Sequence, residues 1–298
     1  MEASAGTPVY RRGIRMQRPE TWRTILYGII GAILFAVLFL VSFRPREKSI
    51  ARQPVDIVIF GDSVFGEIRD EYAVPAQLQK ILGKSIYNGA FGGTCAARTE
   101  PERRLDYTRE LFCLAELAKS VESGDFGVQQ SAVMRESNTE YFGDVIDGLD
   151  AIDFSGVETI LIQQGLNDYH AGVPLENPEE PYDERTFKGA LRAAVRSFRR
   201  VNPKVRIVLI TPTYTWYTVI GKTCEESDNG GGILEDYVNA DLQLAEELDL
   251  EVIDVYHDFY PHESWEDWKL YSRDGLHPNE AGRELLTEKI AELLLQSK

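Results

Sequence analysis

Three short peptides, far apart in the sequence, contain the side chains with the clearest chemistry: Gly61-Asp62-Ser63, Gly165-Leu166-Asn167-Asp168 and Asp274-Gly275-Leu276-His277. A serine hydroxyl attacks an acyl carbon efficiently only when a base accepts its proton. An imidazole can be that base when a carboxylate orients its second nitrogen, and an amide N–H can stabilise the oxyanion that forms. Together the three peptides predict acyl transfer through a serine.

Ser63 is the candidate nucleophile, although an isolated Gly-Asp-Ser is also typical of a turn that caps a helix. The spacing differs from the G-x-S-x-G pattern, because Gly66 falls one residue late. His277 is the candidate base, and we expect Asp274, three residues earlier, to orient it. Pro278 disfavours helical geometry at His277, so the pattern predicts a Ser-His-Asp triad whose base lies in a loop.

Three groups could donate hydrogen bonds to an oxyanion. They are the side chain of Asn167, the backbone N–H of Ser63 and the backbone N–H of a glycine in the loop at residues 88–94. Gly93 is the predicted glycine and Gly92 is the alternative, since both allow close approach of the backbone to a substrate. A simple turn after a strand is the competing interpretation of this loop.

Apolar strand-like runs alternate with amphipathic helical patterns after residue 54. The runs are 56–60, 85–88, 157–163, 205–210 and 251–255, and the helical patterns include 74–82, 186–200, 234–248 and 280–295. Such alternation predicts a parallel sheet with helices on both faces. Active sites in such sheets lie at the carboxyl ends of the strands, where Ser63, Asn167 and His277 all fall.

The stretch at about 99–150 is longer than one crossover helix requires. Its pattern is helical over 101–122 and again up to about residue 149, with Gly124 between the two parts. We predict a helical insertion. It could form a lid or wall beside the site, or it could serve packing alone.

Residues 24–43 contain no charged side chain and predict a transmembrane signal anchor. A buried helix and a cleaved signal peptide are the alternatives, but the run has neither a polar face nor a small-x-small cleavage site. We expect residues 1–23 to form a short basic cytoplasmic tail and residues 44–54 to form a linker. Residues 55–298 would then form an extracellular domain on a single-pass cell-membrane protein.

The net charge is −16 at pH 7 and is concentrated after residue 49, which argues against nucleic acid or anionic lipid as a main partner. Cys95, Cys113 and Cys224 show no spacing typical of a metal site. One pair could form a disulfide, or all three could be buried thiols. The sequence predicts neither a metal nor a cofactor.

Four segments resemble the signature blocks of the SGNH, or GDSL-type, hydrolases: Gly61-Asp62-Ser63, the block ending at Gly93, Gly165-x-Asn167-Asp168 and Asp274-x-x-His277. The resemblance implies a flavodoxin-like three-layer α/β/α sandwich with a five-stranded parallel sheet, which the transmembrane helix would precede. It implies Ser63 as nucleophile, Asp274 and His277 as the rest of the triad, and Ser63, Gly93 and Asn167 as the oxyanion hole. Residues 123–125 and 153–155 resemble a membrane-anchored subgroup from Gram-positive bacteria. Gln163-Gln164 depart from the usual pattern.

The expected function is that of a serine esterase acting through an acyl-enzyme. Its expected substrates are short-chain esters, in particular acetyl esters, on an extracytoplasmic carbohydrate. Tyr214, Trp216 and Tyr217 could stack on sugar rings or wall an acyl pocket, and core packing explains them nearly as well. The alternatives are a glycan O-acetyltransferase, a lysophospholipase or thioesterase acting on lipid acyl groups, and a non-catalytic glycan-binding module. The partners would be the ester substrate and, through the N-terminal helix, the membrane.

Overall fold

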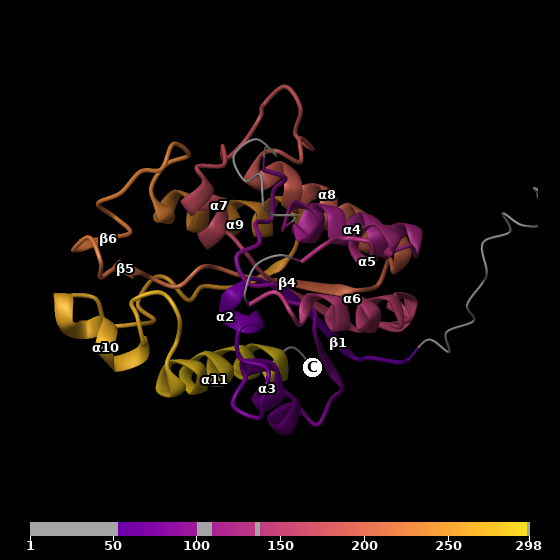
Figure 1. Ribbon diagram of the computed structural model, residues 1–298, viewed down its shortest axis with the longest axis horizontal. Coiled ribbons are helices and arrows are strands. Elements are labelled where there is room, and N and C mark those ends of the chain that lie inside the picture. Colours follow the sequence, from indigo (N-terminus) through magenta and orange to yellow (C-terminus); the bar gives the residue numbers. More distant parts are fainter. Residues whose placement is uncertain (1–52, 100–108, 135–137, 297–298) are drawn as a thin grey trace, which may run out of the picture. The chain divides into compact units, whose positions relative to one another are not determined.

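A computed structural model describes residues 53–99, 109–134 and 138–296, which belong to one compact unit (Figure 1). The predicted tail at 1–23, the predicted anchor at 24–43 and most of the predicted linker at 44–54 lie outside these residues. Within the described ranges, no helix has both the length and the apolar character needed to cross a membrane.

Five parallel strands form the central sheet: β2 (Ile86–Asn88), β1 (Ile57–Gly61), β3 (Thr159–Gln163), β4 (Arg206–Ile210) and β7 (Glu251–Ile253), in that order. Every residue of β1 and β3 is buried, as expected of strands covered on both faces. The predicted five-stranded parallel sheet is confirmed. Its strand order of 2-1-3-4-5 along the chain is the flavodoxin-like order.

Successive strand residues face two separate hydrophobic cores, because side chains alternate along a strand. In β1, Val58 and Phe60 join one core, while Ile57 and Ile59 join the other. The first core is covered by α4 (Leu114–Ser123), α6 (Phe142–Asp150), α8 (Phe187–Val201) and α9 (Leu234–Leu248). The second is covered by α3 (Val74–Leu82) and α11 (Glu280–Gln296), so the domain has three layers (Figure 1).

The described parts of the predicted insertion pack into the first of these helical layers. They contain a 3₁₀ turn at Arg109–Phe112, α4, the short α5 (Gly127–Gln130) and α6. Leu114, Leu117 and Val121 of α4 are buried, and α4 lies against α8. Gly124 ends α4 in the left-handed conformation with φ of 68°, where glycine avoids the steric cost of a side chain. The observed packing therefore favours a structural role for most of this segment.

Several short elements were not predicted from the sequence. They are α2 (Ser63–Gly66), α7 (Leu166–Ala171), α10 (Trp268–Tyr271), and a hairpin of β5 (Trp216–Tyr217) and β6 (Lys222–Thr223). All lie near the carboxyl ends of the sheet strands, where α2 and α7 directly follow β1 and β3. These short elements therefore provide much of the local structure around the candidate site.

All three cysteines are free thiols in buried positions, so the alternative of a disulfide is not realised. Burial raises the pKa of Cys113 to about 12 and also raises the pKa of Cys224. The thiols of Cys113 and Cys224 consequently remain protonated at neutral pH and act as small apolar side chains.

Candidate active site

Ser63 is the first residue of α2, and one residue, Asp62, separates it from the end of β1. Asp62 precedes it as the N-cap, and its Oδ1 accepts a hydrogen bond of 2.9 Å from the backbone N–H of Val64. Asp62 is fully buried, and its hydrogen bond to Val64 fixes the start of the helical turn. The Ser63 side chain is thereby held at the carboxyl edge of the sheet.

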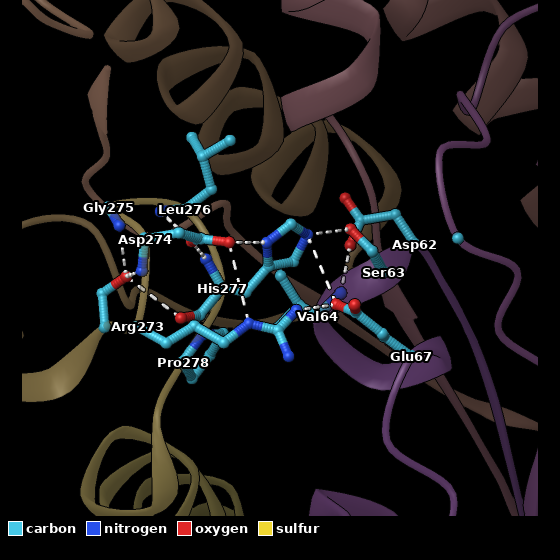
Figure 2. Close-up of polar contacts among 12 residues, drawn as sticks. Asp62, Ser63, Val64, Glu67, Arg273, Asp274, Gly275, Leu276, His277 and Pro278 are labelled. Atoms are coloured by element: carbon cyan, nitrogen blue, oxygen red, sulfur yellow. Dashed lines mark hydrogen bonds and ion pairs between the residues drawn. The ribbon is translucent and has the colours of Figure 1, made fainter. Parts of the chain in front are cut away.

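Ser63, His277 and Asp274 form one chain of hydrogen bonds (Figure 2). The distance from Ser63 Oγ to His277 Nε2 is 3.0 Å, and the distance from His277 Nδ1 to Asp274 Oδ2 is 2.7 Å. Both lie within hydrogen-bond range. The structure therefore brings Ser63 next to a pair of residues that follow it in the sequence by more than two hundred positions.

The loop that bears His277 is fixed by its own hydrogen bonds and by the neighbouring hairpin. Ser272 Oγ accepts from the N–H of Gly275 at 2.8 Å and donates to the carbonyl of His277 at 3.0 Å. The carbonyl of Gly275 accepts from the N–H of Trp216 at 2.9 Å. Gly275 has φ of 96°, and a Cβ there would lie 2.2 Å from the carbonyl oxygen of Trp216. Only glycine fits this position without movement of the backbone.

Asp274 is held in its ionised form. Partial burial acts to raise its pKa, but hydrogen bonds from the backbone N–H and the imidazole of His277 and from the N–H of Leu276 outweigh that effect. The net pKa lies below the ordinary value. At neutral pH Asp274 is therefore a carboxylate that can orient the imidazole and stabilise its cation.

Asn167 lies in the first turn of α7, and its side-chain amide donates to Asp62 Oδ2 at 3.3 Å. Because Asp62 adjoins Ser63, this bond holds the amide next to the candidate nucleophile. A Cβ on Gly92 would lie 3.7 Å from the Cβ of Ser63, so the loop at 88–94 adjoins the same position. The N–H of Gly92 already donates to Tyr141 Oη at 2.8 Å, which favours Gly93 as the backbone donor.

Tyr141 and Arg69 support this loop, and sequence reasoning missed both. The guanidinium of Arg69 lies 4.3 Å from the ring centroid of Tyr141 and donates to the carbonyls of Asn88 and Ala90. Tyr141 in turn accepts from Gly92. Neither residue belongs to a recognisable motif, and only the unusual length of the insertion pointed to a segment near the site.

Asp168, which follows Asn167, connects α7 to the segment after Gly93. Its two carboxyl oxygens accept from the N–H groups of Ala96 and Ala97 at 2.8 and 2.9 Å. Complete burial raises its pKa to about 7, and burial likewise raises the pKa of Asp62 to about 6. These two carboxyls thus fix the backbone around Ser63 and Asn167.

The other aromatic and histidine side chains near this edge of the sheet mainly contact one another. Tyr214 and Trp216 are buried, and Tyr214 stacks on His262 with ring centroids 4.3 Å apart. Tyr217 is half-buried, and its hydroxyl lies 2.9 Å from His170 Nε2. Core packing therefore accounts for Tyr214 and Trp216 better than contact with a sugar does.

The two glutamines that depart from the family pattern, Gln163 and Gln164, are buried. The Oε1 atom of each has no hydrogen-bond partner in the described part of the chain. The amide of Gln163 helps to stabilise the ionised form of Asp62. These side chains therefore place polar groups beneath the site.

Residues 59–285 match the sequence model of the GDSL-like lipase/acylhydrolase family. The chain belongs to this family, because the match covers most of its length and the fold and site agree with it. The protein is accordingly a hydrolase of the lipase/acylhydrolase class. No curated protein matches the chain in sequence.

Solved structures similar to this chain share its fold at low identity. A protein from Lactobacillus plantarum is 18% identical, with a TM-score of 0.57 over 83% of this chain and 99% of that one. A possible lipase from Chitinophaga pinensis is 17% identical, with a TM-score of 0.55 over 81% and 98%. An acetyl xylan esterase is 15% identical, with a TM-score of 0.50 over 80% and 100%. At such low sequence identities, the similarity shows that these proteins share a fold with this chain.

Proposed function

We propose that this protein is a serine esterase in which Ser63 is the nucleophile, His277 the general base and Asp274 its orienting carboxylate. The observation that carries the proposal is the continuous set of bonds at 3.0 and 2.7 Å from Ser63 through His277 to Asp274. Asn167 Nδ2 and the N–H groups of Ser63 and Gly93 are the proposed oxyanion donors.

The reaction follows from these roles. Ser63 Oγ attacks the ester carbonyl carbon while His277 Nε2 accepts the hydroxyl proton. The tetrahedral intermediate then expels the alcohol, which takes that proton from Nε2, and an acyl-serine remains. Water attacks the acyl-serine, again giving a proton to Nε2, which returns it to Ser63 Oγ as the carboxylic acid leaves.

We propose short acyl groups, acetyl in particular, on a carbohydrate as the substrate class. The similar fold of an acetyl xylan esterase agrees with this choice.

We further propose that residues 24–43 anchor the protein in the cell membrane with the esterase domain outside, as in the anchored Gram-positive subgroup. The uncharged run and the basic residues before it support this orientation. Protease added to intact cells should then degrade the domain, whereas a domain that is degraded only after lysis would contradict the proposal.

An acyl chain-length series tests the activity and the substrate class together. We expect the purified full-length protein to hydrolyse p-nitrophenyl acetate faster than the butyrate and much faster than the palmitate. Ser63→Ala should lower kcat by at least about 10⁴-fold. Unchanged activity in Ser63→Ala would refute the proposed nucleophile. Product analysis with an added glycan acceptor would detect transfer to a sugar instead of water.

A lysophospholipase or thioesterase is the second candidate, and one observation favours it. Val219 and Ile220, at the tip of the β5–β6 hairpin, are 97% and 63% exposed. Thr218, next to Val219, donates to the carbonyl of Asp274, so this apolar tip adjoins the triad loop. A clear optimum at long acyl chains would replace the carbohydrate proposal with this one.

A further inference from the structure

Two charged side chains outside the triad lie against it, Glu67 and Arg273 (Figure 2). Glu67 Oε2 lies 3.6 Å from His277 Nε2 and accepts a hydrogen bond from the guanidinium of Arg273. Arg273 Nε lies 3.7 Å from Asp274 Oδ2. The Glu67–Arg273 ion pair therefore contacts the hydrogen-bonded chain at His277 and at Asp274.

The fold fixes the position of Glu67 relative to the nucleophile. Glu67 is the C-cap of α2, and its N–H donates to the carbonyl of Ser63 at 3.1 Å. Residues four apart in a helical turn lie on the same face, so Glu67 and Ser63 both face the imidazole of His277. Arg273 directly precedes Asp274, and its own N–H donates to the carbonyl of His277 at 3.0 Å.

The distances assign different roles to the two nearest neighbours of His277 Nε2. Ser63 Oγ, at 3.0 Å, is within hydrogen-bond range, whereas Glu67 Oε2, at 3.6 Å, is beyond it. A carboxylate at that distance attracts an imidazolium cation much more than a neutral imidazole. The cation of Arg273, paired with the same carboxylate, weakens that attraction.

We propose that Glu67 and Arg273 are positioning residues that balance the charge on His277. Glu67 stabilises the imidazolium that forms when Ser63 gives up its proton. Arg273 offsets part of the Glu67 charge, so that the carboxylate acts less strongly on the imidazole before the proton is transferred. The inference rests on the proposed function, since it assigns His277 the role of general base. Within the described part of the chain, Asp274 and the buried Asp62 also interact electrostatically with His277.

The test is the pH profile of kcat/KM for p-nitrophenyl acetate in Glu67→Gln and Arg273→Gln. In Glu67→Gln the acidic limb should move to lower pH by about half a unit, because the cation loses an attractive charge. In Arg273→Gln the limb should move to higher pH by a similar amount, because Glu67 then acts unopposed. The double variant should lie within about 0.2 units of the unmodified protein if the two effects cancel.

A structural role would give a different pattern. If the ion pair only joined α2 to the His277 loop, the two variants would reduce kcat/KM alike and shift the acidic limb equally or not at all. Either result would overturn the proposal. Glu158→Gln is the matched control, since Glu158 pairs with Lys84 at comparable exposure near the opposite end of the strands. This control should leave the profile unchanged.

A second readout separates failure of this inference from failure of the proposed function. The chain contains four histidines, so the titration of His277 can be followed by NMR in protein labelled at the histidine rings. The midpoint should move down in Glu67→Gln and up in Arg273→Gln even if no ester is hydrolysed. Shifts of one sign in both variants, or none, would refute the charge balance whatever the activity.

Discussion

Two turns of this chain have the same pattern, Asp-x-x-His, and the same internal hydrogen bonds. In the first, Asp254 Oδ1 accepts from the N–H groups of Tyr256 and His257 at 2.9 and 3.1 Å, and Oδ2 lies 2.8 Å from His257 Nδ1. In the second, Asp274 makes the equivalent contacts at 2.9, 2.8 and 2.7 Å. Each carboxylate therefore orients its imidazole in the same way.

The turns differ in what the outer nitrogen of the imidazole meets. His277 Nε2 lies 3.0 Å from Ser63 Oγ, whereas His257 Nε2 lies 3.4 Å from a carboxylate oxygen of Glu235. His257 is thus placed between two acidic side chains, Asp254 and Glu235, and their hydrogen bonds raise its pKa. The Asp-x-x-His turn supplies an oriented imidazole, and only the neighbour at Nε2 makes that imidazole a candidate base.

Replacement of the two histidines should give the largest difference in activity between the two turns. His277→Ala should lower kcat for p-nitrophenyl acetate by about 10⁴-fold or more, because Ser63 loses its proton acceptor. His257→Ala should change kcat less than about three-fold, since the structure places Glu235 at its outer nitrogen. A loss above ten-fold in a folded His257→Ala would show that the two turns are not functionally distinct.

Replacement of the aspartates should give the next largest difference. Asp274→Asn should lower kcat by about 10³-fold, because an amide neither stabilises the imidazolium nor fixes its tautomer. Asp254→Asn should leave kcat within about three-fold. Steady-state kinetics on both variants measures this difference, with circular dichroism as the control for folding. Equal losses in the two variants would contradict the assignment.

Replacement of Asn167, whose side-chain amide lies beside Ser63, should lower kcat less than replacement of a triad residue does. Asn167→Ala should lower kcat by about 10²-fold while changing KM little, because its N–H would act on the oxyanion of the transition state. Asn167→Asp removes the donor with little change in volume but places a second carboxyl beside Asp62, so it should show a larger loss. An increase in KM at constant kcat would instead indicate that Asn167 binds the ground state.

The smallest expected effect concerns stability and the Asp254–His257 turn. The pKa of His257 is raised in the folded protein, so its contribution to stability is present below its unfolded value and is lost as pH rises through the folded value. His257→Gln should therefore lower the free energy of unfolding more at pH 5.5 than at pH 8.5. The difference should be about 0.5 kcal/mol, since the side chain is 40% exposed and its ion pairs are screened. Urea unfolding at the two pH values measures it, and a larger loss at pH 8.5 would contradict the sign.

The long elements and the triad could be predicted from the sequence for physical reasons. Buried parallel strands are apolar throughout, and α3 and α9 show amphipathic patterns whose predicted bounds match Val74–Leu82 and Leu234–Leu248. The proximity of Ser63 and His277 then followed from the rule that the carboxyl ends of parallel strands lie at one edge of a sheet. The sequence predicted His277 as the base because Asp274 precedes it by three residues and Pro278 keeps it in a loop. The Asp-x-x-His spacing alone does not distinguish it from His257.

The rest could not be predicted because it depends on contacts between distant segments. Glu67 and Arg273 are separated by 206 positions, and nothing near either residue indicates the other. Tyr141 reaches Gly92 across 49 positions. The short strand β5 is held by a backbone bond from Trp216 to Gly275, so its own sequence does not determine it. Such features become visible only when the fold brings the segments together.

The 214 positions between the two partners of the Ser63–His277 bond also determine when this protein can first act. A ribosome completes the strand that presents the hydroxyl early in translation, whereas the imidazole emerges only near the end. A truncated or half-made chain thus holds an inert alcohol rather than a reactive one. Under the proposed roles of Ser63 and His277, ester cleavage by this domain therefore requires that synthesis and folding are both complete.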